Sequence, residues 1–168
     1  MSLHPLEIKI DNEVAEALKR ANVTYLFGIP GGGTSIDLIE SCNEVGIPFV
    51  LVQHETSAAI MAVVCAELTN SCGACISIMG PGAINLASGA GYAFWERHPL
   101  LCFTESYGLG KAPKMSIQRI DHAKMFSVFS QVLPTKPNIK YCINRIVFTL
   151  CVYFTPISSC PNKTLFVC

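Results

Sequence analysis

The sequence predicts a single α/β domain of three layers, in which a central parallel sheet is flanked by helices. Short, continuous apolar segments alternate with longer segments whose apolar residues recur at helical spacing. Strands that are apolar on both faces are typical of a parallel sheet covered on each side. The length of 168 residues fits one domain, spanning residues 1–168, with one core. The predicted strands are residues 25–29, 49–52, 74–79, 100–104 and 164–167.

Periodicity and capping residues predict the helices between these strands. Apolar residues in Val14–Ala21 follow i, i+3, i+4, i+7 spacing, and Asp11 or Asn12 can cap that helix. Thr34 or Ser35 can cap a second helix. The remaining predicted helices cover about 56–68, the segment after the glycine turn at 80–82 to about 94, about 121–129 and about 139–153.

Composition argues against several classes of protein. Lys+Arg and Asp+Glu each number 12, so the chain has no basic footprint for nucleic acid. Because only 14% of residues are charged and 51% are hydrophobic, a partner is expected to cover part of the surface. No apolar run reaches the roughly 18 residues of a membrane-spanning helix, and the N-terminus does not resemble a signal peptide. We therefore expect a cytoplasmic protein that does not enter a membrane.

Nine cysteines could indicate a disulfide scaffold, a metal site or buried thiols. Most lie in apolar segments, as Cys102 and Cys151 do, which favours reduced, buried cysteines that act as small hydrophobic residues. Cys72 and Cys75 have the spacing of a metal or redox pair. A zinc site needs about four ligands, however, and no second such pair follows, so no metal site is predicted.

Three features follow predicted strands: the glycine loop Gly28–Gly33, the pair His54 and Glu55, and the turn Gly80–Gly82. Ligands of parallel sheets bind at the carboxyl ends of the strands. Because all three features lie at such ends, we expect them to form one site.

The residues alone leave more than one interpretation of each feature. The glycine loop suits an anion at a helix N-terminus or is a bare turn, but it has neither the P-loop lysine nor dinucleotide-binding spacing. Glu55 lies between an apolar strand and a nearly uncharged helix, where a buried carboxyl group needs a partner or its proton; it could also be an ordinary capping acid. The turn at 80–82 opens a helix of small residues, which suits either a flat ring or tight helix packing.

The order of four segments resembles the N-terminal domain of acetolactate synthase and its relatives. These segments read LFGIPGGG, VQHETSAAIMA, GPGAINLASG and RHPLLCFTES, and the segment from Ser116 to Phe126 resembles a family segment built around a glutamine. The resemblance is dense over residues 14–130 and weak over 131–168. It implies the thiamine diphosphate-binding fold, with this chain as the module that binds the pyrimidine ring.

The resemblance also implies a role for each matching residue. Glu55 matches the catalytic glutamate that bonds to N1′ of the aminopyrimidine and favours the imino tautomer, whose nitrogen takes the thiazolium C2 proton. The cofactor-binding positions are Pro30, Gly31, Glu55, Pro81, Asn85 and Gln118. His54, which precedes the glutamate, is expected to be structural.

The sequence departs from the family pattern in three places. Val63–Glu67 replaces the usual Asp-Gly-Tyr-Ala-Arg, and Ile78 with Met79 replaces the hydroxyl-bearing pair before the turn. The Gly-Asp-Gly motif that holds magnesium and the diphosphate does not occur.

The missing motif leads to an expectation about partners. We expect half of an active site, inactive alone, completed in an oligomer by a diphosphate-binding domain from another chain. The chain would then be a subunit of a split enzyme or a truncated copy; the alternative is a non-catalytic or regulatory domain that pairs with a full-length relative. These residues specify neither a 2-keto acid nor FAD.

Overall fold

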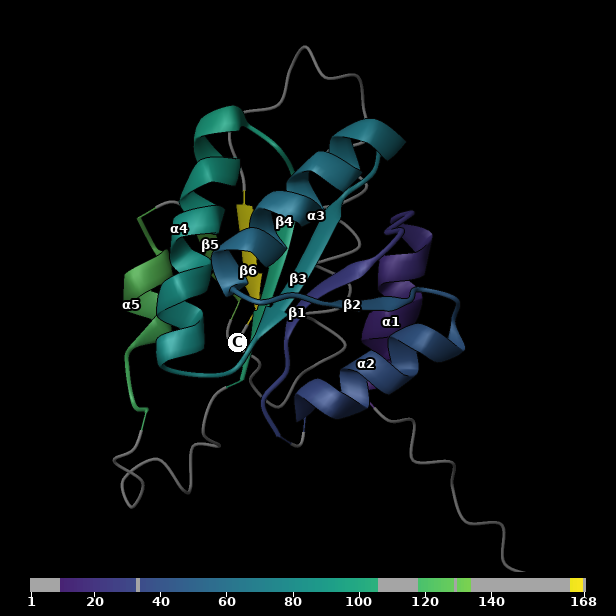
Figure 1. Ribbon diagram of the computed structural model, residues 1–168, viewed down its shortest axis with the longest axis horizontal. Coiled ribbons are helices and arrows are strands. Elements are labelled where there is room, and N and C mark those ends of the chain that lie inside the picture. The colour runs from purple at the N-terminus through teal and green to yellow at the C-terminus, as the bar shows by residue number, and fades with distance from the viewer. Residues whose placement is uncertain (1–9, 33, 106–117, 129, 134–163, 168) are drawn as a thin grey trace, which may run out of the picture.

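The structure of the chain is a computed structural model that describes residues 10–32, 34–105, 118–128, 130–133 and 164–167. A six-stranded sheet forms its centre, with the order β2-β1-β3-β4-β6-β5 (Figure 1). Each pair of neighbouring strands is parallel, as the continuous apolar segments predict. The strands are β1 Leu26–Ile29, β2 Phe49–Leu51, β3 Gly73–Ser77, β4 Leu100–Thr104, β5 Ser130–Leu133 and β6 Thr164–Val167. The sequence did not predict β5.

Helices cover both faces of the sheet, which confirms the three-layer prediction (Figure 1). The helices α3, α4 and α5 lie on one face, and α1 and α2 lie on the other. Their bounds are α1 Ile10–Arg20, α2 Thr34–Glu44, α3 Glu55–Thr69, α4 Pro81–Glu96 and α5 His122–Phe126. The helix predicted over 139–153 lies outside the described residues. No helix in the described ranges is long and apolar enough to cross a membrane.

The predicted cap of α1 is wrong, because the helix begins at Ile10 and already includes Asp11 and Asn12. The side chain of Asn12 has another partner: Ser41 Oγ on α2 donates to Asn12 Oδ1 at 2.7 Å. This bond joins the two helices on the same face of the sheet.

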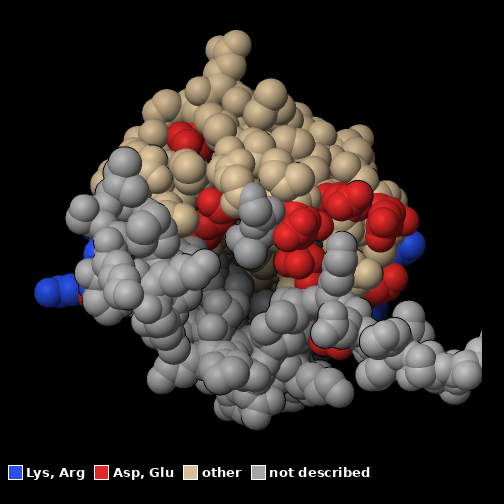
Figure 2. Space-filling model, turned by 90° about the horizontal axis from the view of Figure 1, so that it is seen from below, with Lys and Arg blue, Asp and Glu red and all other residues tan. Residues whose placement is uncertain are grey.

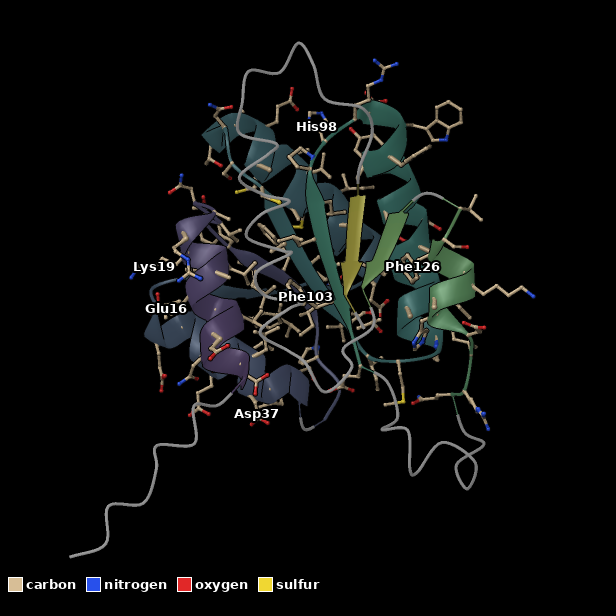
Figure 3. All side chains as sticks on the ribbon, turned by 180° about the vertical axis from the view of Figure 1, so that it is seen from behind. Glu16, Lys19, Asp37, His98, Phe103 and Phe126 are labelled. Carbon is tan, nitrogen blue, oxygen red and sulfur yellow. The ribbon has the colours of Figure 1, made fainter. Side chains whose placement is uncertain are left out.

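Alternating side chains of the strands divide the core into two halves. On β4, Leu101 and Phe103 pack with α1 and α2, while Leu100 and Cys102 pack with α3 and α4. Phe126 of α5 is fully buried in the second half (Figure 3). Because both faces of β4 are buried, its five residues are apolar or, at Thr104, buried polar.

The helices α3 and α4 approach each other closely through small residues. A Cβ at Gly89 would collide with the Ala59 side chain and would lie 2.9 Å from the carbonyl oxygen of Thr56. This spacing brings the N-terminal turns of both helices together at the carboxyl ends of the strands, which form the lower edge in Figure 1. We call this edge, with the loops that follow the strands, the carboxyl edge.

The order of the strands also marks a point where ligands bind in such sheets. From β1 the chain moves outward to β2 on one side, and then to β3 and β4 on the other. The direction of winding therefore changes between β1 and β3, and a crevice at the carboxyl ends is expected there.

The cysteines in the described ranges agree with the prediction of buried thiols. Five are free, and all of them except the half-buried Cys65 are buried. Cys75 Sγ lies 3.6 Å from Cys102 Sγ on the neighbouring strand. Within the part of the chain that the structure describes, no group of three or more His, Cys, Asp or Glu residues could hold a metal ion.

Burial of Cys42 predicts a loss of stability in alkali. Burial raises the pKa of its thiol from 9.0 to about 12, with a smaller contribution from the charge of Asp11. The unfolded chain therefore releases this proton before the folded chain does, and stability falls as pH rises from about 9 towards 12. Between pH 8.5 and 10.5, in reducing buffer, Cys42→Ala should lose about 2 kcal/mol less unfolding free energy than the wild type. Urea denaturation at both pH values measures this difference, and equal losses in the two proteins would contradict it.

Candidate functional site

Glu55 is a buried carboxyl group held by a neighbouring amide. It occupies the first position of α3 and is 7% exposed. Asn85 Nδ2, on α4, donates to Glu55 Oε2 at 3.0 Å. The carboxyl group also lies at the positive end of the helix dipole, which stabilises negative charge. Two sequence-predicted residues 30 positions apart are thus in direct contact.

The capping function at α3 belongs to His54 rather than to Glu55. The Nδ1 atom of His54 accepts a hydrogen bond from the backbone N–H of Thr56 at 3.3 Å. The hydroxyl of Thr56 in turn donates to the backbone oxygen of Asn85 at 2.6 Å. His54 is therefore structural, as expected, and Thr56 fixes the helix turn that carries Asn85. The sequence analysis did not single out Thr56.

Gly82 lets its neighbours Glu55 and Ile78 approach the backbone more closely than a side chain there would allow. A Cβ at position 82 would lie 3.0 Å from Glu55 Oε1 and 2.6 Å from Ile78 Cγ2. Ser77 lies on the same side, with its Cβ 3.6 Å from that position. Its Oγ is buried and has no hydrogen-bond partner, alone in this respect among the described side chains. Asn85 thus holds one oxygen of Glu55, while the other faces Gly82.

The glycine loop reaches the same region through Ile78. A Cβ at Gly31 would lie 2.8 Å from Ile78 Cγ1, so this side chain contacts both Gly31 and Gly82. Ile78 stands where the resemblance leads one to expect a hydroxyl, and its side chain lies close to the backbone of both glycines. Pro30 precedes Gly31 and is half-buried, whereas Pro81 is exposed at the start of α4.

Gln118 reaches the site through its backbone. Gly80 adopts a φ of +68°, which disfavours any side chain, and a Cβ there would lie 2.6 Å from the carbonyl oxygen of Gln118. The side chain of Gln118 is exposed. The backbone N–H of Gly80 donates to Nε2 of the buried His122 at 3.1 Å. His122, which sequence reasoning missed, therefore holds the turn before Pro81.

A second buried carboxyl group, Glu105, was also missed. It follows β4 directly, is 8% exposed, and accepts a hydrogen bond from the backbone N–H of Ser35 at 3.1 Å. The predicted cap of α2 is therefore wrong for Ser35, whose Oγ accepts from the N–H of Gly31 at 3.0 Å. The available signal was position: an acid that directly follows an apolar strand, at the same edge of the sheet as Glu55.

Carboxyl groups also dominate the visible part of the carboxyl edge. Figure 2 shows this face from below, with red Asp and Glu side chains over its centre and right and blue Lys and Arg side chains only at its margins. Phosphate groups are bound in proteins mainly by cations and helix N-termini. The described residues on this face therefore suit a neutral ring better than a diphosphate.

The fold and the site define an α/β domain with a ligand crevice, and comparison with known proteins identifies its family. Residues 8–125 match the model for the thiamine pyrophosphate enzyme, N-terminal TPP binding domain. The chain therefore belongs to this family, whose cofactor is thiamine pyrophosphate, also called thiamine diphosphate.

Several acetolactate synthases are similar to this chain. Isozyme 2 large subunit of Escherichia coli is 34% identical over 91 residues, covering 54% of this chain and 16% of that protein. The synthase of Bacillus subtilis is 32% identical over 114 residues, covering 67% and 20%. That of Arthrospira platensis is 33% identical over 122 residues, covering 71% and 20%. The chain thus matches about a fifth of the length of these relatives.

His122 predicts a loss of stability in mild acid. Burial lowers its pKa below the ordinary 6.5, although the charge of Asp121 opposes this shift. As pH falls through about 6.5, the unfolded chain takes up this proton before the folded chain does, and stability falls until the lowered pKa is passed. Protonation also removes the acceptor for the Gly80 N–H. His122→Gln, whose amide oxygen can accept that bond without titrating, should lose less unfolding free energy between pH 7.5 and 5.5 than the wild type.

Asp121→Asn provides the companion variant. Asparagine retains the capping oxygen that accepts from Lys124 N–H but removes the charge that raises the pKa of His122. The loss of stability on acidification should then extend to lower pH. Chemical denaturation across the pH series measures both effects, and identical profiles for all three proteins would contradict the assignment to His122.

Proposed function

We propose that this chain binds the aminopyrimidine ring of thiamine diphosphate at the carboxyl edge, with Glu55 contacting N1′ of the ring. The observation that carries the proposal is a buried carboxyl group at the carboxyl edge, with one oxygen held by Asn85 and the other close to Gly82. Pro30, Gly31, Pro81 and Gln118 would line the same crevice. The full function would be that of an acetolactate synthase-like 2-keto acid carboligase or decarboxylase.

The residues present fit the ring. Glycine at 31 and 82 brings the backbone close to Ile78 from two sides, and Gly82 also allows close approach of the Glu55 carboxyl group. The unpaired hydroxyl of Ser77 lies near Gly82 and offers a further hydrogen bond. When bound, the cofactor supplies the thiazolium carbon that adds to 2-keto acids. Glu55 would hold the proton shared with N1′, and Asn85 would keep the carboxyl group in place.

A diphosphate-binding domain outside these 168 residues would hold the other end of the cofactor together with magnesium. One observation supports this: cationic side chains lie only at the margins of the visible carboxyl edge. The active site would then be shared, and these residues alone would not turn over a 2-keto acid. A role as a non-catalytic partner of a full-length relative is the alternative, favoured by Ile78 and Met79 in place of hydroxyl groups.

Exchange of Glu55 for glutamine tests the proposal. In the complex with a diphosphate-binding domain, Glu55→Gln should slow exchange of the cofactor C2 proton by about 10²–10⁴-fold, because the amide cannot share its proton with N1′. The melting temperature should stay level or rise, because glutamine removes a buried ionisable group and can still accept from Asn85. Proton NMR of the cofactor measures the exchange, and thermal unfolding measures the stability.

The matched control is Glu67→Gln, on the exposed side of the same helix. It should change neither the exchange rate nor the melting temperature appreciably, because exposed ion pairs such as that of Glu67 with His98 contribute little to stability. Unchanged proton exchange in Glu55→Gln, with a lower melting temperature, would show that Glu55 stabilises the fold and does not activate the cofactor. That result would favour the non-catalytic alternative.

An exposed apolar surface supports association with a partner. The outer sides of α3 and α4 carry large apolar residues that are 37–82% exposed. They are Ile60, Met61, Val64 and Leu68 on α3, and Ile84, Tyr92 and Trp95 on α4. We call this the α3–α4 surface. Large exposed apolar residues gathered on neighbouring helices are typical of an interface.

Sedimentation of a variant with one charge introduced into the α3–α4 surface tests whether this surface forms an interface. The wild-type chain should form dimers or larger assemblies at micromolar concentration, and Val64→Asp should shift it towards the monomer, because the substitution would bury an unpaired charge in the interface. Val128→Asp is the control, since Val128 is 79% exposed but follows α5 and belongs to neither helix of the α3–α4 surface. A wild-type monomer at high concentration would count against the interface.

A further inference from the structure

A closed set of contacts links the glycine loop, the first turn of α2 and the end of β4. The N–H of Gly31 donates to Ser35 Oγ at 3.0 Å, and the N–H of Ser35 donates to Glu105 Oε1 at 3.1 Å. The second carboxyl oxygen, Oε2, lies directly against Gly31, where a Cβ would collide with it. Glu105 thus contacts the backbone of Ser35 through one carboxyl oxygen and the backbone of Gly31 through the other.

The carboxyl group of Glu105 lies where the sequence of the glycine loop suggests that an anion could bind. A loop of glycines that opens a helix presents backbone N–H groups and the positive end of the dipole to an anion. Here the carboxyl group of Glu105, from a residue 70 positions away, occupies that place. Ser35 is 2% exposed and Glu105 is 8% exposed, so the contact is shielded from water.

We propose that Glu105 is a positioning residue that acts as an internal anion. It anchors Gly31 and the start of α2, and so sets how closely the loop approaches the cofactor ring beside Ile78. The effect on the cofactor ring, which is the second part of the proposal, rests on the proposed function. The anchoring of Gly31 and α2 requires no ligand. Glu105 contacts Gly31 and not the reacting atoms, and its effect on the ring passes through the loop.

Amide hydrogen exchange in the ligand-free 168-residue chain tests the anchoring. In Glu105→Ala, the amide of Ser35 should exchange about 10- to 100-fold faster, because a hydrogen bond to a charged acceptor is lost, and the amide of Gly31 should follow. The amide of Leu101, in the centre of β4, serves as the reference for global unfolding. Glu44→Ala, at the exposed C-terminal end of α2, is the matched control and should change none of the three.

Chemical rescue separates an internal anion from a merely structural side chain. Formate should restore slow exchange at Ser35 in Glu105→Ala, whereas formamide and chloride at equal concentration should not. Restoration by formamide as well would show that charge is irrelevant, and no restoration by formate would show that the site does not act as an anion site. Either outcome overturns the proposal, as does unchanged exchange at Ser35 and Gly31.

Two further variants keep the test decisive if Glu105→Ala unfolds. Glu105→Gln retains an acceptor oxygen without charge, and exchange at Ser35 should rise about 5-fold, in keeping with the weaker bond to a neutral acceptor. Ser35→Ala removes only the acceptor of the Gly31 N–H, so exchange should rise at Gly31 and not at the backbone amide of position 35. Wild-type exchange at Ser35 in the glutamine variant would overturn the proposal.

Binding of thiamine diphosphate, followed by NMR shifts of the same chain, tests the second part. The dissociation constant should rise at least about 10-fold in Glu105→Ala, in parallel with the loosened loop, and should recover with formate. Unchanged binding despite faster exchange would overturn the positioning role. If the wild type does not bind even in the complex with a diphosphate-binding domain, the proposed function fails, while the exchange and rescue results still decide the anchoring.

Discussion

The close packing of α3 against α4 is the constraint on which the candidate site depends. Gly89 lets the two helices meet at Ala59 and Thr56, where any side chain would collide. Both helices begin at the carboxyl edge, so this packing also fixes the distance between Glu55, at the start of one, and Asn85, in the first turns of the other. A helix of small residues is therefore a requirement of the site as well as of the core.

The local parts of the fold could be predicted because they depend on short-range patterns. The strand at 100–104 agrees with the structure at both ends, since its five residues are bounded by Pro99 and an acid. The strand β5 could not be found in the same way. Its four residues include Ser130 and Gln131, and they pair with β6, more than thirty positions further along the chain. Such pairing is a tertiary effect that overrides local propensity.

In the candidate site, too, features with a local signal could be predicted, and features that depend on distant contacts could not. Glu55 was found because an acid between an apolar strand and an apolar helix is unusual in itself, and Asn85 was found through the family resemblance. Glu105 also follows an apolar strand, but its meaning depends on Ser35 and Gly31, which only the fold brings to it. His122 is similar, because its partner is the backbone of Gly80 in a different loop. Contacts between a side chain and a distant backbone leave little trace in sequence.

The strand β6 has a consequence for how the domain is made. It lies between β4 and β5, although it comes last in sequence among the described strands. Until residues 164–167 leave the ribosome, β4 presents an open, apolar edge to the cell, and β5 has no neighbour with which to pair. The sheet therefore closes late, by insertion, and the nascent chain passes through a stage in which the centre of its future core is open to mispairing. Chaperones that shield extended apolar segments would act at that stage of synthesis.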